Sequence, residues 1–333
     1  MIRSIPFRHL IAAACAVLAI SAIPFTDYPQ AEISNGLVHA RIYLPDAENG
    51  YYRATRFDWA GVIPQLEYKG HTYCAQWFAK YDPIVSDAVM GPVEAFTPLG
   101  YDSAKPGGHF VQIGVGVLSR DNDSPWQFYK YYKILNHGEW KISQRADRVE
   151  FVHTLNDSTY SYEYKKTLSL TRDKPQLVLT HSLKNTGHRT IETTVFDHNF
   201  FVLDDEPTGP DADVSFPFSP KPVPNNGVMR GIDTLVRIQE HQVLFLKTPQ
   251  GRQFVYTLLE GFGNSAKDYD IRIENHKTGA ALRITSDQPM EKLMFWANPS
   301  VYCPEPYIHI KIAPGEVFNW KIVYDLDTCE IRK

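Results

Sequence analysis

Two side chains in this sequence have the types and settings that proton-transfer chemistry needs. The first, His198, lies in residues 195–201, an apolar strand-like run that polar residues interrupt. A buried imidazole costs free energy unless it is hydrogen-bonded, and Asp197 is a poor partner because strand neighbours point to opposite faces. Histidine titrates near neutral pH, so His198 is a candidate acid or base. The alternative is a core histidine whose hydrogen bonds are satisfied.

The second side chain, Glu305, lies between Pro304 and Pro306. Prolines cannot donate hydrogen bonds to a strand ladder, so this segment is expected to be an edge, a bulge or a strand end that presents its side chain. A carboxylate held there could act as a base; the alternative is a surface glutamate. Taken alone, these two residues do not distinguish an enzyme from a binding module.

The elements that must position these residues are strands. Residues 177–183 and 318–326 alternate apolar and polar side chains, a period-2 pattern typical of β-strands. Further strand-like runs are residues 38–44, 52–59, 110–118, 149–155, 190–203, 242–247, 254–259, 269–275 and 282–285. Turn residues separate them, which predicts an all-β sandwich or barrel. Residues 204–231 are the least regular, and we interpret them as a functional or rim loop.

Composition and the N-terminus narrow the class of protein. The chain has 333 residues, 13% of them aromatic, and a formal net charge of −4, which gives no reason to predict a nucleic-acid partner. Residues 1–22 resemble a signal peptide, with Arg3 and Arg8 before an apolar run at residues 10–20 and a small-residue cleavage point. That run is too short to span a bilayer of ~30 Å. We therefore expect export to the periplasm or the extracellular space without stable membrane insertion; the alternative is a retained N-terminal helix.

The other residues that could do chemistry give no standard constellation. The sequence contains no G-x-S-x-G, no phosphate loop and no H-E-x-x-H. Beyond the signal, Cys74, Cys303 and Cys329 show no metal-ligand spacing. Neither a metal nor a cofactor is therefore predicted. One disulfide is permitted, but the sequence does not choose its pair, and we expect each cysteine to be a small buried apolar residue.

The motifs of the C-terminal third follow one another in a recognisable order. They are a hairpin at residues 271–289, an aromatic strand at residues 293–296, the Cys303-Pro304-Glu305-Pro306 segment, and Pro314-Gly315-Glu316 before an aromatic-rich strand. This order resembles the galactose mutarotase (aldose 1-epimerase) superfamily, over roughly residues 35 to 327. The resemblance implies a large antiparallel β-sandwich, the galactose mutarotase-like supersandwich, as one domain over residues 35–330.

The same resemblance implies roles for the two candidate residues. Glu305 falls where the family carries its catalytic glutamate, and residues 197–201 look like its histidine motif. The implied activity is interconversion of sugar anomers, with Glu305 as base and His198 as acid, no cofactor, and a small carbohydrate as partner. We expect the two residues on facing strands of a concave sheet, separated by about one pyranose ring.

Further residues are predicted to hold the sugar. Residues 91–96 stand where the family has a His-Gly motif, with Glu94 and no histidine, and Asp268 or Asp270 is the candidate for the sugar-gripping aspartate. Aromatic faces also bind sugars, and Trp296 and Tyr307 bracket Glu305. The predicted substrate-binding residues are Arg53, Arg56, Glu94, Asp270, Trp296 and Tyr307. For the two arginines, a solvated surface charge is the alternative.

Three other functions stay open. The first is a non-catalytic carbohydrate-binding protein on the same fold, since the fold does not fix the function. The second is an accessory domain of a glycan-active enzyme, although no other catalytic domain is evident in the sequence. The third is a structural envelope protein, which aliphatic packing of the concave face would favour.

Overall fold

The structure is a computed structural model that describes residues 28–332, so the predicted signal peptide lies outside the described residues. Apart from one 3-10 turn, η1 (Ala266–Asp268), every regular element within residues 28–332 is a β-strand. All pairs of named strands are antiparallel in this part of the chain. The all-β prediction is confirmed. No helix between residues 28 and 332 is both long and apolar enough to cross a membrane.

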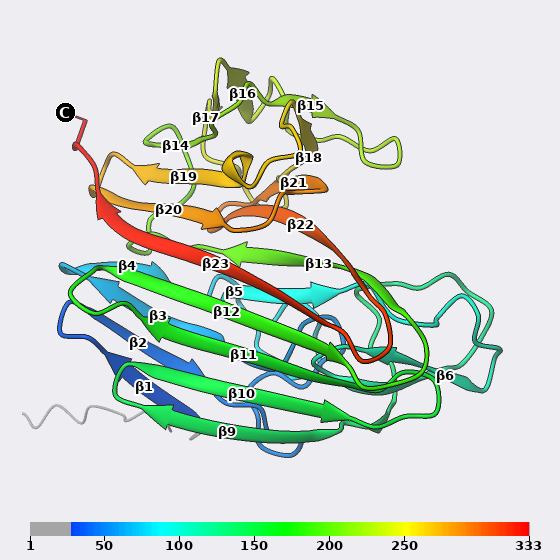
Figure 1. The fold of residues 1–333 in the computed structure, drawn as a ribbon. Helices are drawn as coiled ribbons and strands as arrows, with labels where there is room; N and C mark the ends of the chain where they lie inside the picture. The colour runs from blue at the N-terminus through cyan, green and yellow to red at the C-terminus, as the bar shows by residue number, and fades with distance from the viewer. Residues whose placement is uncertain (1–27, 333) are drawn as a thin grey trace, which may run out of the picture.

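The largest element is a ten-stranded sheet that forms one layer of the molecule (Figure 1). In spatial order its strands are β16 (Val236–Gln239), β17 (Gln242–Phe245), β14 (Ala212–Ser215), β19 (Asp270–Asn275), β20 (Ala280–Ser286), β23 (Val317–Thr328), β12 (Gln176–Asn185), β11 (Tyr162–Leu170), β10 (Arg148–Leu155) and β9 (Glu139–Arg145).

Three smaller sheets complete the fold. A six-stranded sheet has the order β15 (Lys221–Val223), β18 (Val255–Glu260), β21 (Lys292–Ala297), β22 (Tyr302–Ile312), β13 (Ile191–Phe200) and β5 (Gly91–Phe96). A four-stranded sheet runs β1 (Gln30–Ser34), β2 (Val38–Tyr43), β3 (Val62–Tyr68) and β4 (His71–Cys74), and a three-stranded sheet runs β6 (Gly108–Gln112), β7 (Gly116–Arg120) and β8 (Ile134–Asn136).

The main core lies between the ten-stranded sheet and the six- and four-stranded sheets behind it (Figure 1). Strand alternation fills this core: along β12, Leu177, Leu179 and Leu183 are fully buried, whereas residues 178, 180 and 182 are not buried. Burying each such side chain contributes about 1.5–3 kcal/mol. The period-2 pattern in the sequence therefore identified the inward face of this strand correctly.

Two of the predicted strands are wrong. Residues 52–59 form turns and bends, and their backbone amides bond to scattered partners, such as Asp58 N to Glu94 O. The aromatic side chains of this segment are buried although its backbone forms no ladder with a neighbouring strand. Their spacing in the sequence therefore resembled that of a strand. Residues 110–118 are not one strand but the β6–β7 hairpin, whose turn requires positive φ at Gly114 (77°) and Gly116 (137°).

A second hydrophobic cluster covers the opposite, outer face of the six-stranded sheet. It gathers side chains from β5, β13 and β22 with those of residues 51–62 and of the three-stranded sheet. Because alternate residues of a strand face opposite sides, β5, β13 and β22 each contribute to both clusters. This outer face carries the candidate site.

Candidate functional site

A cavity of about 490 Å³ opens on the outer face of the six-stranded sheet. Its lining is mostly aromatic, with a few charged and amide groups. The lining residues are Arg56, Trp77, Asp87, Ala95, Trp126, Phe128, Phe196, His198, Phe200, Asn225, Asn226, Phe254, Tyr256, Met294, Trp296, Glu305 and Tyr307. A concave, largely apolar pocket with a few convergent polar groups is the usual form of a small-molecule site. Asn225 and Asn226 lie in residues 204–231, but that range is not a single rim loop as predicted, because it contains strands β14 and β15 of the two largest sheets.

His198 reaches the cavity through the alternation of β13. Phe196, His198 and Phe200 face outward, whereas Asp197 faces the main core and accepts a hydrogen bond from Tyr324 of the ten-stranded sheet. The imidazole is stacked on the Phe200 ring with centroids 3.9 Å apart. Packing against Phe200 therefore holds the imidazole ring in place, and only 4% of His198 is exposed.

Glu305 lies in the middle of β22, between β21 and β13, so the prediction of an edge, bulge or strand end is wrong. The β22–β21 ladder runs through both prolines, but the β22–β13 ladder stops at Phe196 opposite Tyr307 and resumes at the isolated bridge between Phe201 and Tyr302. The gap in the β13 ladder accommodates the prolines, which have no N–H to donate, and Asn199 Nδ2 donates instead to the Pro304 carbonyl oxygen at 2.8 Å.

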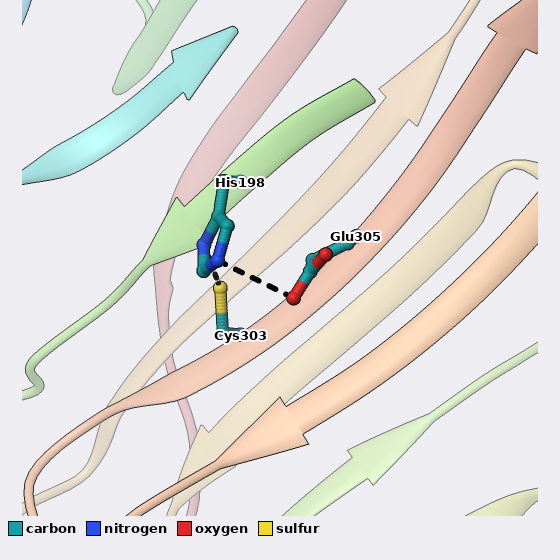
Figure 2. A group of neighbouring side chains, drawn as sticks. All are labelled: His198, Cys303 and Glu305. Carbon is teal, nitrogen blue, oxygen red and sulfur yellow. Dashed lines mark hydrogen bonds and ion pairs between the residues drawn. The ribbon is translucent and has the colours of Figure 1, made fainter. Parts of the chain in front are cut away.

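This register places His198 opposite Glu305 on neighbouring strands, as Figure 2 shows. His198 Nε2 and Glu305 Oε1 are 3.4 Å apart. The expectation of facing strands with a pyranose-sized gap is wrong, because cross-strand neighbours on one face lie side by side. A sugar would meet both groups from the cavity side. The two oxygens that react in anomer exchange are bonded to the same carbon, so two adjacent groups can reach both.

Burial sets the protonation of this pair. Burial raises the pKa of Glu305 to about 7, against the opposing charges of Arg56 and Lys292. Burial also lowers the pKa of His198 well below its ordinary value, and the Arg56 charge adds to this effect. Below pH 7 the pair therefore holds one proton, which rests on the carboxyl group.

Arg56 lines the cavity, whereas the other predicted arginine does not. The Arg56 guanidinium forms an ion pair with Asp87. It lies over the rings of Phe57 and Phe128, 4.6 and 4.4 Å from their centroids. The flat, charged group is thereby held at the cavity wall, where it can donate hydrogen bonds to a hydroxyl-rich ligand. Arg53 instead donates to the Glu48 carbonyl oxygen on the surface.

The two predicted aromatic residues both line the cavity, together with Trp77. Trp77 is stacked on Phe200, and Trp296 meets Trp77 edge to face with centroids 5.6 Å apart. Tyr307 is stacked on Phe196 at 4.5 Å. These rings offer the apolar faces on which a sugar ring can stack.

Two further predicted ligand residues lie elsewhere. Glu94 faces the main core, where it forms ion pairs with Lys166 and His181, because its strand position is out of phase with the cavity. Asp270 lies on β19 of the ten-stranded sheet and forms an ion pair with Arg283. Neither lines the cavity, so the structure does not bring these two predicted residues to the candidate site.

Sequence reasoning missed Cys303, which lies directly behind the pair. Its Sγ is 2.6 Å from His198 Nδ1, and the residue is completely buried (Figure 2). The available signal was its spacing, since Cys303, Glu305 and Tyr307 occupy alternate positions and therefore share one strand face. Cys74, Cys303 and Cys329 are all free thiols.

Two groups of side chains could offer metal ligands within residues 28–332. His198, Cys303 and Glu305 bring donor atoms within 4.8 Å of one another, as do Asp213, Glu274 and His276. In the first group the imidazole presents Nδ1 to the thiol and Nε2 to the carboxylate, so one ion cannot contact all three donors without rotation of the ring. In the second, Arg332 already provides a positive charge beside Asp213. Neither arrangement fits a metal as it stands.

Comparison with known proteins gives similarity in structure but not in sequence. No family model matches the chain, and no curated protein matches it. Three solved structures superpose over nearly their whole length: a candidate aldose 1-epimerase of Escherichia coli K12 (TM-score 0.56, 17% identity, 90% of this chain and 99% of that one), a galactose mutarotase related enzyme of Lactobacillus acidophilus (0.55, 12%, 91% and 100%) and the GalM/aldose epimerase homologue of C. elegans (0.54, 12%, 91% and 100%).

These similarities define the class of fold. The chain has the galactose mutarotase-like β-sandwich fold. The resemblance seen in the order of the C-terminal motifs is confirmed at that level. Identities of 12–17% carry the fold alone, so the activity has to be argued from the cavity.

Proposed function

We propose that this protein is an aldose 1-epimerase-like isomerase that interconverts the anomers of a small sugar in this cavity. The observation that carries the proposal is the pairing of His198 and Glu305 at 3.4 Å in the wall of an aromatic cavity. Anomer exchange needs one acid and one base at the same carbon, and this pair can supply both.

The proton transfers balance when the His198–Glu305 pair starts the reaction with one proton, held on the Glu305 carboxyl group. Transfer from the Glu305 carboxyl to His198 Nε2 gives the carboxylate and the imidazolium. Glu305 then takes the proton of the anomeric hydroxyl while His198 gives its Nε2 proton to the ring oxygen. The bond between the anomeric carbon and the ring oxygen breaks, and an aldehyde forms. Rotation about the first carbon–carbon bond and reversal of these steps produce the other anomer.

The surroundings of the pair support an enzyme over the rival functions. A binding protein needs aromatic faces and hydrogen bonds but no titrating pair, whereas here burial holds the Glu305 pKa at about 7. A structural protein would be favoured by aliphatic packing, but the cavity wall is mostly aromatic. Export through the signal peptide stays a prediction, and it favours sugars of the environment or the cell envelope.

Polarimetry of freshly dissolved aldoses tests this proposal. We expect the wild type to accelerate mutarotation of at least one common aldose and His198→Ala to lose that acceleration while remaining folded. Absence of acceleration with every neutral and acidic aldose tested would contradict the enzymatic proposal. Sugar binding by calorimetry would then identify a non-catalytic carbohydrate-binding protein.

The pH dependence of the reaction is expected to be bell-shaped. The raised pKa of Glu305, about 7, means that the pair keeps its working proton below pH 7 and loses it above. The lowered pKa of His198 means that a second proton, which leaves no base, binds only well below pH 6.5. The measurement is kcat/KM against pH, corrected for uncatalysed mutarotation.

Lys292→Met provides a check on this assignment. Lys292 has its Nζ over the Tyr307 ring, and its positive charge lowers the Glu305 pKa. Removing that charge should move the alkaline limb to higher pH. A rate that rises through pH 7 to a plateau would show that ionised Glu305 alone suffices and would contradict the one-proton pair.

A further inference from the structure

The buried thiol of Cys303 contacts the His198–Glu305 pair but takes no part in the proposed proton transfers. It does not line the cavity, yet its Sγ lies 2.6 Å from His198 Nδ1, whereas Glu305 approaches the other ring nitrogen, Nε2. The imidazole therefore has a sulfur on one nitrogen and a carboxyl oxygen on the other. Figure 2 shows these three side chains, with the imidazole in contact with both Cys303 and Glu305.

The two protonation states of the His198–Glu305 pair require different hydrogen-bond partners at His198 Nδ1. When Glu305 carries the proton it can donate to Nε2, and the ring hydrogen then lies on Nδ1 and needs an acceptor. When the pair has lost its proton, above pH 7, ionised Glu305 can only accept, so Nε2 carries the hydrogen of the neutral ring and Nδ1 needs a donor. A thiol can do both, as a weak donor and a weak acceptor.

Cys303 is able to stay neutral through this exchange. It is completely buried among apolar groups, and burial raises the pKa of its thiol well above the ordinary value. A thiolate would accept only, and an apolar side chain would leave Nδ1 buried without a partner, which costs free energy. The neutral thiol satisfies Nδ1 in both states without adding a charge.

From this geometry we propose that Cys303 is a positioning residue, whose Sγ holds His198 Nδ1 so that Nε2 is the nitrogen that exchanges protons with Glu305 and the ligand. The role is analogous in kind to that of any second partner that fixes the orientation of a catalytic histidine ring, here with either ring tautomer. The proposal rests on the proposed function only for its kinetic consequence. The placement of the ring proton is a property of the protein alone.

The experiment compares Cys303→Ala, Cys303→Ser and Cys74→Ala. Cys303→Ala removes the Nδ1 partner and is expected to lower kcat by about 10- to 100-fold with little change in KM. Cys303→Ser restores a donor and acceptor and should recover kcat to within about threefold. Cys74→Ala removes another buried thiol with no contact to His198 and should leave kcat unchanged.

Nitrogen-15 NMR of the imidazole, assigned with His198→Ala, gives a readout that does not depend on catalysis. The wild type and Cys303→Ser should show one protonated and one unprotonated ring nitrogen at a given pH, whereas Cys303→Ala should show averaged shifts. Unchanged shifts and an unchanged pH profile in Cys303→Ala would overturn the proposal. If the wild type shows no mutarotation, the proposed function fails and the shifts alone decide the role of Cys303.

Discussion

Replacing Lys166 by methionine is expected to lower the free energy of unfolding by about 3–5 kcal/mol. Lys166 is completely buried between the sheets, where its ammonium group forms ion pairs with Glu94 and Asp58 and donates to the Ala60 carbonyl oxygen at 2.8 Å. Glu94 has a second partner, His181, but Asp58 loses its only ion-pair partner among the described residues. Removing one member of a buried ionic group leaves charge that neither water nor protein compensates. Urea unfolding, with the midpoint and slope both measured, provides the test.

Lys165→Met is the matched control. Lys165 is the neighbouring residue on β11, faces solvent, and forms an exposed ion pair with Glu150. Surface pairs of this kind contribute about 0–1 kcal/mol. Equal stability of the two variants would show that the buried group is not ionised in the folded protein. A deficit in Lys166→Met that Asp58→Asn partly restores would locate the cost at the unpaired carboxylate.

The fold could be predicted from the sequence because its signal is repetitive. In β12 and β23, alternate residues enter the core, and the pattern follows directly from strand geometry. The prediction failed at residues 52–59, where aromatic side chains are buried by loops instead of by a ladder. Apolar spacing reports burial, and only backbone pairing, which no single segment determines, distinguishes a strand from a buried loop.

The site was predictable only in part because long-range register decides which residues meet. His198 and Glu305 meet because β13 and β22 pair with a register that neither segment specifies alone. Strand phase removed Glu94 from the site: in β5 its neighbours Val93 and Ala95 lie in the outer cluster, so Glu94 faces inward. Asp270 was misplaced for a different reason, because β19 belongs to the other large sheet.

Glu305→Gln is expected to lower kcat/KM for mutarotation by about 10²–10⁴-fold, the usual contribution of one positioned proton-transfer group. The amide keeps the shape of the side chain but can neither take nor give the proton that the carboxyl group holds below pH 7. Because only 6% of Glu305 is exposed and burial disfavours its charged form, the amide should be tolerated by the fold. Polarimetry gives the rate, and calorimetry of sugar binding shows that the cavity is intact.

The control for this variant is Glu192→Gln, which removes an exposed carboxylate from the same sheet. Glu192 lies on β13 and forms an ion pair with Lys311 at the surface. It is not part of the cavity wall, so mutarotation should be unchanged. If Glu305→Gln keeps a rate within about threefold of the wild type, a loss too small for a proton-transfer group, Glu305 is not the acid–base residue. If the rate is lost while sugar affinity is retained, the carboxyl group acts in the chemical step, because binding and catalysis have then been separated.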